Sequence, residues 1–321
     1  MSLVVIGVNN RTMPLDLFEQ FAIGEEALPK ALAGVHGCRN ISEAIVLSTC
    51  NRTEVYVYAE KFHGAYQDVR DFFAETAQIA PESFNDYLYA HYDSDAIQHL
   101  FSVTCGLDSA VVGENEVQHQ VKVAWERARE EGTCGTVINE AFRRALEVGK
   151  RVRTQTDLSR NSSSVAKACV EMANHQLGNL ADQRILVLGA GEVGEGVATS
   201  LAKLETGHIS FINRSFERAH ELAKRIDAEA IPFEKINEAL SSCDVLLTST
   251  ASDSAIFDRA RLETIMDGRK GKELLIIDIA VPRDVDPAVA SIDGITLFDI
   301  DALWSFCTKN SLISNSHLIP E

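Results

Sequence analysis

The sequence predicts an α/β protein in which an N-terminal α+β domain is joined to a Rossmann-like, doubly wound domain. From Arg184 onward, short and almost continuously apolar segments alternate with helical stretches, which is typical of a parallel sheet covered on both faces. A glycine-rich loop follows the first of these segments. The earlier part of the chain lacks this alternation. A chain of 321 residues, of which 45% are hydrophobic, has room for about two domains.

The first domain, predicted over residues 1–155, mixes strand-like and helix-like segments in a compact α+β arrangement. A long helical stretch runs from about residue 115 to 177, and the polar segment Arg160–Ser164 predicts a break or a capped helix start within it. The strand candidates are Leu3–Val8, Ala44–Ser48 and Glu54–Tyr58, and the helix candidates are Glu25–Val35 and Ala65–Thr76.

The second domain is predicted over residues 156–300, with residues 301–321 as a separate tail. Its order of strands and helices predicts the doubly wound sheet. The strand candidates are Arg184–Leu188, His208–Ile212, Asp244–Thr248 and Glu273–Asp278, and the helix candidates between them include Glu192–Lys203 and Phe216–Ile226.

Composition restricts the classes of protein to which the chain can belong. Seven cysteines are scattered without a Cys-x-x-Cys pair, which favours neither a disulfide framework nor a zinc site, so we expect no metal. The chain starts without a basic leader, and no run approaches the ~18 apolar residues of a membrane span. We therefore expect a cytoplasmic protein that has no membrane partner.

The net charge of −17 argues against a protein that coats nucleic acid in general, because phosphate binding depends on clustered cations. A local basic face is still compatible with this charge. Basic residues in the helical stretch between residues 136 and 155 recur seven positions apart and so lie on similar faces. We favour an ordinary solvated helix face as the interpretation. These residues are Arg143, Arg144, Lys150, Arg151 and Arg153.

The segment Thr49-Cys50-Asn51-Arg52, between two strand-like runs, carries the strongest chemical signal. A thiol at the end of an apolar strand, with a guanidinium two residues on, suits a nucleophile for an anionic substrate. Arg52 either lowers the thiol pKa or binds a substrate carboxylate through paired hydrogen bonds. The alternative is a half-buried structural cysteine, which is the commoner case for a lone Cys.

A G-x-G-x-x-G loop between a strand candidate and a helix candidate gives the second chemical signal. Its glycines allow a tight turn, close approach of the backbone to a pyrophosphate, and tight packing of helix on strand. The helix N-terminus offers free N–H groups to phosphates. We therefore predict a dinucleotide site rather than a purely structural turn. The cofactor-binding candidates in this loop are Gly189, Ala190, Gly191, Glu192, Val193 and Gly194.

The end of the next strand predicts which dinucleotide binds. An NAD site usually has an acidic residue about 20 positions after the loop, whereas this chain has Asn213, Arg214 and Ser215 there. Arg214 and the Ser215 hydroxyl suit a 2′-phosphate, so we predict NADPH; an ordinary surface position at a helix start is the alternative for Arg214. A cysteine nucleophile with this cofactor predicts acyl reduction through a thioester, or the reverse aldehyde oxidation, with the acyl donor left open.

Six groups of residues occur in this order along the chain: Ser48–Tyr56, Gly106–Ser109, Val112–Glu114 with Gln120–Lys122, Lys150–Thr154, Gly189–Gly194 and Asp278–Val285. Together these motifs resemble the glutamyl-tRNA reductase family, in that family's order, over roughly residues 3–305. The resemblance implies a catalytic domain, an NADP-binding domain and the NADPH-dependent reduction of glutamyl-tRNA to glutamate-1-semialdehyde. That reaction is the first committed step of five-carbon tetrapyrrole (porphyrin) biosynthesis. The resemblance also implies glutamate-1-semialdehyde aminotransferase as a channelling partner.

The resemblance implies roles for single residues as well. Cys50 would attack the ester that links glutamate to the tRNA, Arg52 would hold a glutamate carboxylate, and His99 matches a histidine important for activity. A histidine among apolar neighbours is more often a core residue, so the role of His99 depends on the resemblance alone. The further substrate-binding positions are Thr49, Asn51, Ser109, Glu114, Asn115, Glu116 and Gln120.

The chain departs from the family pattern in two respects. After Asn310 it diverges and ends at Glu321, where family members continue into a long spinal helix and a helical dimerisation domain. We therefore expect that the V-shaped family homodimer does not form in its usual way, and that thioester hydrolysis competes with hydride transfer. Within the motifs, the unusual residues are Asn10, Phe18, Asn115, Glu116 and His119.

Two alternative functions remain open from the sequence. One is an NADP-dependent thioester reductase or aldehyde dehydrogenase that acts on a small molecule without tRNA. The other is a degenerate homologue that binds glutamyl-tRNA or a partner protein and performs no chemistry. The joint presence of Cys50, Arg52, Ser109 and the glycine loop favours a catalyst over the degenerate homologue.

Overall fold

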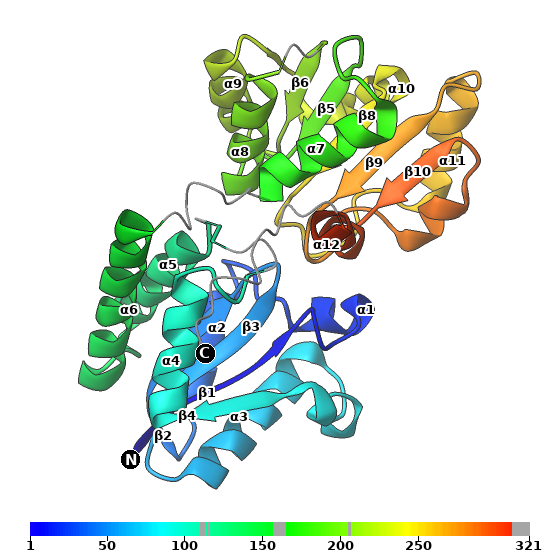
Figure 1. Cartoon of the computed structure of the whole chain (residues 1–321). Coiled ribbons are helices and arrows are strands. Elements are labelled where there is room, and N and C mark those ends of the chain that lie inside the picture. Colours follow the sequence, from blue (N-terminus) through cyan, green and yellow to red (C-terminus); the bar gives the residue numbers. More distant parts are fainter. Residues whose placement is uncertain (110–112, 115, 157–164, 205–206, 310–321) are drawn as a thin grey trace. The chain divides into compact units, whose positions relative to one another are not determined.

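The computed structural model describes residues 1–109, 113–114, 116–156, 165–204 and 207–309. The chain divides into two compact units, unit 1 (Met1–Ser162) and unit 2 (Ser163–Glu321) (Figure 1). Both units combine helices with a sheet, which confirms the predicted α/β fold class. The domain limits expected at residues 155 and 300 remain predictions.

Unit 1 is built on a four-stranded antiparallel sheet with the strand order β2-β3-β1-β4. β1 lies between β3 and β4, and its residues from Leu3 to Val8 are buried. Three of the strands are predicted from the sequence, whereas β4 is missed because its residues are only partly buried and form no continuous apolar run. The strands are β1 (Ser2–Asn9), β2 (Ile41–Ser48), β3 (Arg52–Ala59) and β4 (Tyr89–Tyr92).

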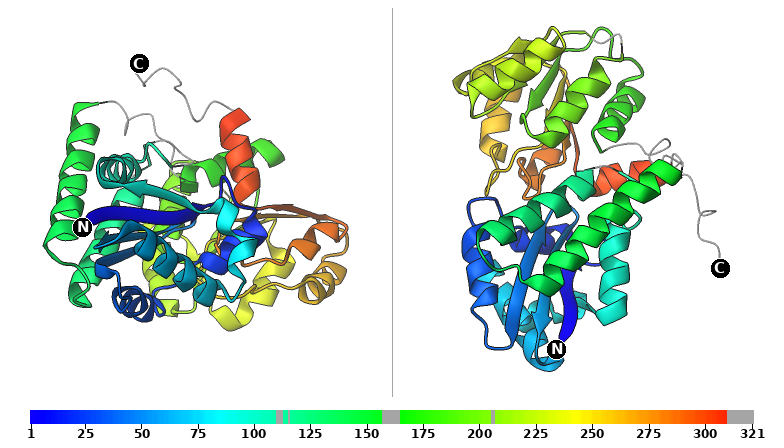
Figure 2. Two further views of the ribbon diagram at one scale, coloured as in Figure 1. Left: turned by 90° about the horizontal axis from the view of Figure 1, so that it is seen from below. Right: turned by 90° about the vertical axis from the view of Figure 1, so that its left-hand side faces the viewer.

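Two groups of helices cover the two faces of this sheet. α2 packs on α3 on one face, and α4, α5 and α6 pack on one another on the other face. Figure 2 (right) shows α2 and α4 on opposite sides of the strands. The helices expected near residues 25–35 and 65–76 are confirmed as α2 and α3. The helices are α1 (Leu15–Phe18), α2 (Leu28–His36), α3 (Phe62–Ala77), α4 (Asp93–Thr104), α5 (Glu116–Glu130) and α6 (Thr136–Gln155).

A break at residues 131–135 separates α5 from α6, and the helix expected from about residue 136 to 155 is confirmed as α6. The carboxylate of Glu43 on β2 accepts hydrogen bonds from the backbone N of Val137 (3.2 Å) and of Ile138 (2.7 Å). It thereby satisfies two N–H groups in the first turn of α6. A Cβ at Gly135 would lie 2.4 Å from the Cδ of Glu43, so a larger residue would displace this carboxylate. A residue far away in the sequence therefore caps the first turn of α6.

Unit 2 is built on a six-stranded parallel sheet with the order β10-β9-β8-β5-β6-β7. The four predicted strands are confirmed as β5, β6, β8 and β9, whereas the edge strands β7 and β10 are not predicted. The strand order reverses at β5, between β6 and β8, and ligands bind beside the carboxyl ends of strands at such points. The strands are β5 (Ile185–Leu188), β6 (Ile209–Ile212), β7 (Glu229–Ala230), β8 (Val245–Thr248), β9 (Leu274–Asp278) and β10 (Ile295–Phe298).

Helices cover both faces of the parallel sheet. α10 packs on α11 on one face, and α7, α8 and α9 lie on the other, with α12 beside α7 (Figure 1). The ring centroid of Phe306 on α12 lies 5.5 Å from that of His175 on α7. The break expected at residues 160–164, before α7, lies outside the described residues. The helices are α7 (Val165–Leu177), α8 (Glu192–Leu201), α9 (Phe216–Arg225), α10 (Ile236–Ser242), α11 (Arg259–Gly268) and α12 (Ile300–Lys309).

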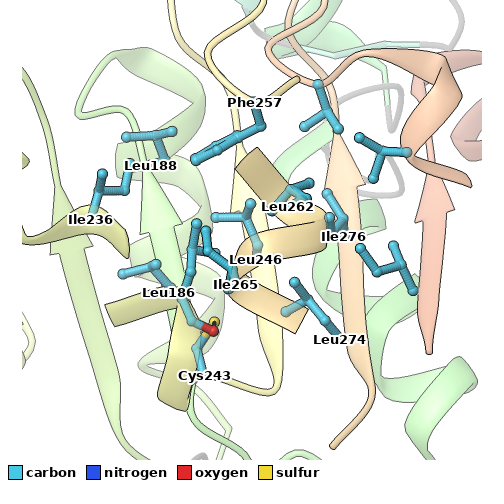
Figure 3. Close-up of a cluster of buried hydrophobic side chains, with 14 of the residues drawn as sticks. Leu186, Leu188, Ile236, Cys243, Leu246, Phe257, Leu262, Ile265, Leu274 and Ile276 are labelled. Atoms are coloured by element: carbon cyan, nitrogen blue, oxygen red, sulfur yellow. Dashed lines mark hydrogen bonds between the residues drawn. The ribbon is translucent and has the colours of Figure 1, made fainter. Parts of the chain in front are cut away.

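A buried apolar cluster joins the parallel sheet to α10 and α11 (Figure 3). Leu186 and Leu188 of β5 take part together, because alternate residues of a strand point to the same face. Leu246 of β8 and Ile276 of β9 pack in the same cluster with Leu262 of α11. Burial of each such side chain contributes roughly 1.5–3 kcal/mol to stability. The cluster therefore stabilises the parallel sheet. The glycine loop begins at the carboxyl end of β5 in this sheet.

Candidate active site

Cys50 lies in the turn that joins β2 to β3, and its side chain is half-buried. The Thr49 backbone N donates to the O of Arg52 (2.8 Å), and the Thr49 Oγ1 accepts from the backbone N of Asn51 and of Arg52 (3.1 Å each). Asn51 is also held from the loop after β1, where the Asn10 Nδ2 donates to its Oδ1 (3.2 Å). Thr49 and Asn51, both predicted to bind substrate, therefore shape the turn that presents Cys50.

The surroundings of Cys50 raise the pKa of its thiol. Burial is the largest cause, and the carboxylates of Glu114 and Glu116 add to it, while the Arg52 guanidinium has a smaller opposing effect. In the absence of substrate the side chain is therefore a neutral thiol. Arg52 does favour the thiolate, as one of its two expected roles has it, but burial and the two carboxylates outweigh this effect. Attack by this sulfur requires a base or a change in the charges around it.

Arg52 is buried, with 3% of its side chain exposed, and its guanidinium is bound within the protein. Its Nη1 lies 2.9 Å from both Glu54 Oε1 and Asp108 Oδ2, and its Nη2 donates to the Asp108 O (2.5 Å). Arg11 binds the same segment, through Asp108 Oδ1 (3.0 Å) and the Ser109 O (2.8 Å). Two arginines therefore bind the Asp108–Ser109 segment, and one of them, Arg52, belongs to the Cys50 turn. Binding of a substrate carboxylate by Arg52 remains a prediction.

Ser109 and Glu114 follow α4 in the sequence, and both residues are buried. The Gly113 N donates to the Gly106 O (2.8 Å) and closes the loop. Arg153 of α6 supports it, because its Nη2 donates to the Glu114 O (3.0 Å). Arg153 therefore binds the backbone of Glu114 instead of contributing to the basic helix face considered from the sequence.

The remaining substrate-binding candidates belong to α5 and the residue before it. Glu116 is the first residue of α5 and Gln120 follows one turn later; both are half-buried. The carboxylate of Glu116 contributes to the raised pKa of Cys50. His119 is exposed. Asn115 lies outside the described residues.

The arginines of the expected basic face are largely balanced by acidic neighbours. Arg143 and Arg144 each form ion pairs with both Glu140 and Glu147 on the exposed side of α6. This arrangement agrees with a solvated helix face. The part of the chain that the structure describes contains no helix both long and apolar enough to cross a bilayer. Nor do three or more His, Cys, Asp or Glu side chains gather in that part in a way that suits a metal ion.

Glu54 on β3 joins this site, although the sequence analysis assigns it no role. Its buried carboxylate accepts from His99 Nε2 (2.7 Å) and Tyr89 Oη (2.6 Å) at Oε1, and from Tyr56 Oη (2.5 Å) at Oε2. Burial alone would raise the pKa of Glu54, but Arg52 and the bonds from His99 and Tyr56 outweigh it and hold the pKa well below its usual value. An acidic residue within a strand of apolar and aromatic neighbours is the signal that could have identified it.

His99, the second catalytic candidate, lies on α4 with 12% of its side chain exposed. Its ring stacks on that of His91 from β4, with the centroids 4.7 Å apart and the planes at 25°. Burial, followed by the neighbouring His99, lowers the pKa of His91. The structure therefore anchors His99 between Glu54 and a second imidazole, and the catalytic role implied for it remains a prediction.

The glycine loop runs from the carboxyl end of β5 into α8. Gly189 has a φ of 111°, and a Cβ there would lie 2.7 Å from the Ser249 O, so this position requires glycine. A Cβ at Gly194 would lie 2.3 Å from the Gly189 O, so glycine also permits the close approach of α8 to the loop. Around Gly191 the described residues leave open space, and α8 begins at the next residue. This arrangement suits a pyrophosphate at the helix N-terminus. Glu192 and Val193 form the first turn of α8.

The residues after β6 lie next to the glycine loop. The Ala190 N donates to Asn213 Oδ1 (3.3 Å), and the Asn213 Nδ2 donates to the Ser215 O (3.1 Å). Ser215 caps α9. Arg214 extends toward the loop after β8, where its Nη2 contacts Ser252 Oγ (3.0 Å). The structure therefore gathers the predicted cofactor-binding residues at the carboxyl ends of neighbouring strands.

Comparison with known proteins agrees with this architecture. Residues 6–156 match the N-terminal domain family of glutamyl-tRNAGlu reductase, and residues 171–306 match the shikimate/quinate 5-dehydrogenase family. Glutamyl-tRNA reductase from Bacillus subtilis is 38% identical over 311 residues, which cover 97% of this chain and 68% of that protein. The enzyme from Priestia megaterium is 37% identical over 310 residues, covering 97% and 70%. The solved glutamyl-tRNA reductase from Methanopyrus kandleri is 33% identical and covers 96% of this chain and 73% of its own, with a TM-score of 0.46.

A dehydrogenase-type nucleotide-binding unit and a unit that presents a cysteine in a tight turn define an oxidoreductase. The two curated relatives are identical to this chain at more than a third of the aligned positions, which span almost the whole of this chain. The chain belongs to the glutamyl-tRNA reductase family, which catalyses the first step of tetrapyrrole biosynthesis.

Proposed function

We propose that this chain reduces glutamyl-tRNA to glutamate-1-semialdehyde with NADPH, through a thioester on Cys50. The observation that carries the proposal is the Cys50 turn, which holds a half-buried thiol and is bound through Arg52 to the segment that contains Ser109. The relatives named glutamyl-tRNA reductases align with this turn and with the nucleotide-binding unit, because the alignments cover 97% of the chain. Channelling to glutamate-1-semialdehyde aminotransferase and a cytoplasmic location belong to the same proposal.

The reaction requires two changes at one carbonyl carbon. First, the Cys50 sulfur bonds to the ester carbonyl carbon, the bond to the tRNA ribose oxygen breaks, and the thiol proton passes to that oxygen as free tRNA leaves. NADPH then supplies a hydride to the thioester carbonyl carbon. The carbon–sulfur bond breaks, Cys50 recovers a proton from solvent, and the aldehyde is released.

The two carboxylates that oppose ionisation of Cys50 explain how binding of the substrate would activate the thiol. An aminoacyl ester carries a positive α-ammonium group, and Glu114 and Glu116 are the carboxylates near the sulfur. An ammonium group bound by them would offset their charge and lower the pKa of the Cys50 thiol. In this proposal Ser109 and Gln120 contribute polar contacts to the same aminoacyl group. The thiol would then be reactive only when its substrate is present.

The nucleotide-binding residues fit NADPH. The N-terminus of α8, with open space around Gly191, suits the pyrophosphate. The Arg214 guanidinium and the Ser215 hydroxyl suit the 2′-phosphate, because Arg forms paired, charge-assisted bonds with phosphate oxygens. The contact of Arg214 with Ser252 limits where the guanidinium lies before the cofactor binds.

The decisive experiment mixes the protein with glutamyl-tRNA, with and without NADPH, and compares the wild type with Cys50→Ser. Semialdehyde from the wild type alone, matched by NADPH consumption, would support the proposal. Free glutamate without semialdehyde would mean that Cys50 reacts but that the thioester is hydrolysed. An ester that stays intact would refute catalysis and favour a binding protein. Equal turnover of a small glutamyl thioester, with no effect of salt on KM, would favour a reductase that acts without tRNA.

A further inference from the structure

Glu54 is a buried carboxylate that takes part in no step of the reaction described above. Four side chains donate to it: Arg52 and Tyr56 from β3, Tyr89 from β4, and His99 from α4. A buried ionic group of this kind is costly to desolvate, and apolar residues of similar volume are often as stable in its place. Stability alone therefore does not account for a carboxylate at this position.

The sheet is shaped to admit this carboxylate. Glu54 lies opposite Gly7 of β1, and Gly7 lies opposite Tyr89 of β4 on the other side. Because Gly7 has no side chain, the Tyr89 Oη reaches Glu54 Oε1 across the central strand at 2.6 Å. A Cβ at Gly7 would lie 2.8 Å from the Cγ of Glu54 and 3.0 Å from the Tyr89 Oη. The glycine therefore creates the space in which the group of donors assembles.

On one side, Glu54 holds Arg52. The backbone of Arg52 closes the Cys50 turn, and its Nη1 lies 2.9 Å from Glu54 Oε1 and 2.9 Å from Asp108 Oδ2. A guanidinium bound to two carboxylates in a buried site has one orientation. In that orientation Arg52 joins the turn of the proposed nucleophile to the segment that contains Ser109.

On the other side, Glu54 holds His99. Its pKa lies well below the usual range, so the carboxylate is ionised at neutral pH and accepts hydrogen bonds only. The His99 Nε2, 2.7 Å from Glu54 Oε1, therefore carries a proton, and Nδ1 is the nitrogen that can accept one. The stacked ring of His91 limits rotation of the imidazole.

We propose that Glu54 is a positioning residue for this reaction. Through Arg52 it sets the Cys50 turn against the Ser109 segment, and through His99 it sets the tautomer of the imidazole. This inference rests on the proposed function, because positioning has meaning only where a reaction occurs at Cys50.

The test compares Glu54→Gln with Tyr56→Phe. Gln keeps the size of the side chain and removes its charge, which both Arg52 and His99 require. Tyr56→Phe removes one donor to the same carboxylate. The hydrogen bond that it removes involves neither Arg52 nor His99, so this variant is the matched structural control. Glu54→Asp restores the charge on a shorter side chain. For each variant we would measure kcat and KM with glutamyl-tRNA, thermal unfolding, and the rate at which iodoacetamide alkylates Cys50 without substrate.

We expect Glu54→Gln to lower kcat about 10²-fold with a small change in KM, because misplacement of reacting groups by about 1 Å costs that much. Glu54→Asp should recover part of the loss. Tyr56→Phe should unfold at a lower temperature and keep kcat within about threefold of wild type. Alkylation of Cys50 should accelerate in Glu54→Gln, because its turn is released, and stay unchanged in Tyr56→Phe.

Two results would overturn the inference. One is a wild-type kcat in Glu54→Gln, and the other is an equal loss of activity and stability in both variants. If the wild type itself forms no semialdehyde, the proposed function fails, and the alkylation rates still decide whether Glu54 positions the Cys50 turn. The two failures are therefore distinguishable.

Discussion

Gly7 and Glu54 lie opposite each other on β1 and β3, and a Cβ at Gly7 would lie 2.8 Å from the Cγ of Glu54. Gly7→Ala should therefore destabilise the protein, because the central strand leaves no room for the added methyl group. We expect a loss of about 1–3 kcal/mol in the free energy of unfolding, as for other overpacked sites. Urea denaturation measures this loss. The matched control is Gly268→Ala, because a Cβ at Gly268 would lie in open space among the described residues. Gly178 is less suitable because its φ of 77° strains any residue other than glycine.

The lowered pKa of Glu54 predicts how stability depends on pH. A carboxyl group with a lowered pKa in the folded state stabilises the fold above its unfolded-state pKa, and this contribution is lost as pH falls toward the folded-state value. At pH 7, Glu54→Gln should cost about 3–5 kcal/mol, because it leaves the buried Arg52 with one charged partner fewer. The difference between wild type and variant should shrink below about pH 4. A difference that stays constant between pH 7 and pH 3 would contradict the lowered pKa.

The raised pKa of Cys50 predicts slow alkylation in the absence of substrate. Because only the thiolate reacts, the rate should rise about tenfold for each pH unit through pH 9 without a plateau. Mass spectrometry of the Cys50 peptide separates this signal from the other cysteines. Glu114→Gln removes a nearby negative charge and should increase the rate at a given pH. A plateau near pH 7 would mean that Arg52 outweighs burial and the two carboxylates in setting the pKa of Cys50.

Arg214 should determine the preference for NADPH. Loss of a charge-assisted bond to a 2′-phosphate costs about 1.5–3 kcal/mol, so Arg214→Ala should raise KM for NADPH about 10- to 100-fold. KM for NADH should change little, because NADH has no 2′-phosphate. Ser252→Ala tests the contact that orients the guanidinium and should have a smaller effect on both values. An equal rise of KM for the two cofactors would remove Arg214 from the 2′-phosphate site.

Local patterns in the sequence were sufficient to predict much of the fold. Most strands of unit 2 are short apolar runs. The spacing of the glycines in the Gly189–Gly194 loop predicts its position between a strand and a helix. The edge strand β7 was missed because two residues show no pattern, and β10 was missed because, at the edge of the sheet, only its first residue is buried. The start of α6 was expected near residue 136, but its cap by the carboxylate of Glu43, on a distant strand, was not predicted because no local pattern shows it.

The sequence by itself determined the residue types that chemistry at this site requires: Cys50 in a turn between strands, and a glycine loop followed by Arg214. It left the state of Cys50 open, because a pKa depends on burial and on charges that are distant along the chain. Only the tertiary structure places Glu114 near that sulfur and turns Arg52 toward Glu54 and Asp108. Electrostatic interactions act through space over a few ångströms, and spacing along the chain does not encode those distances.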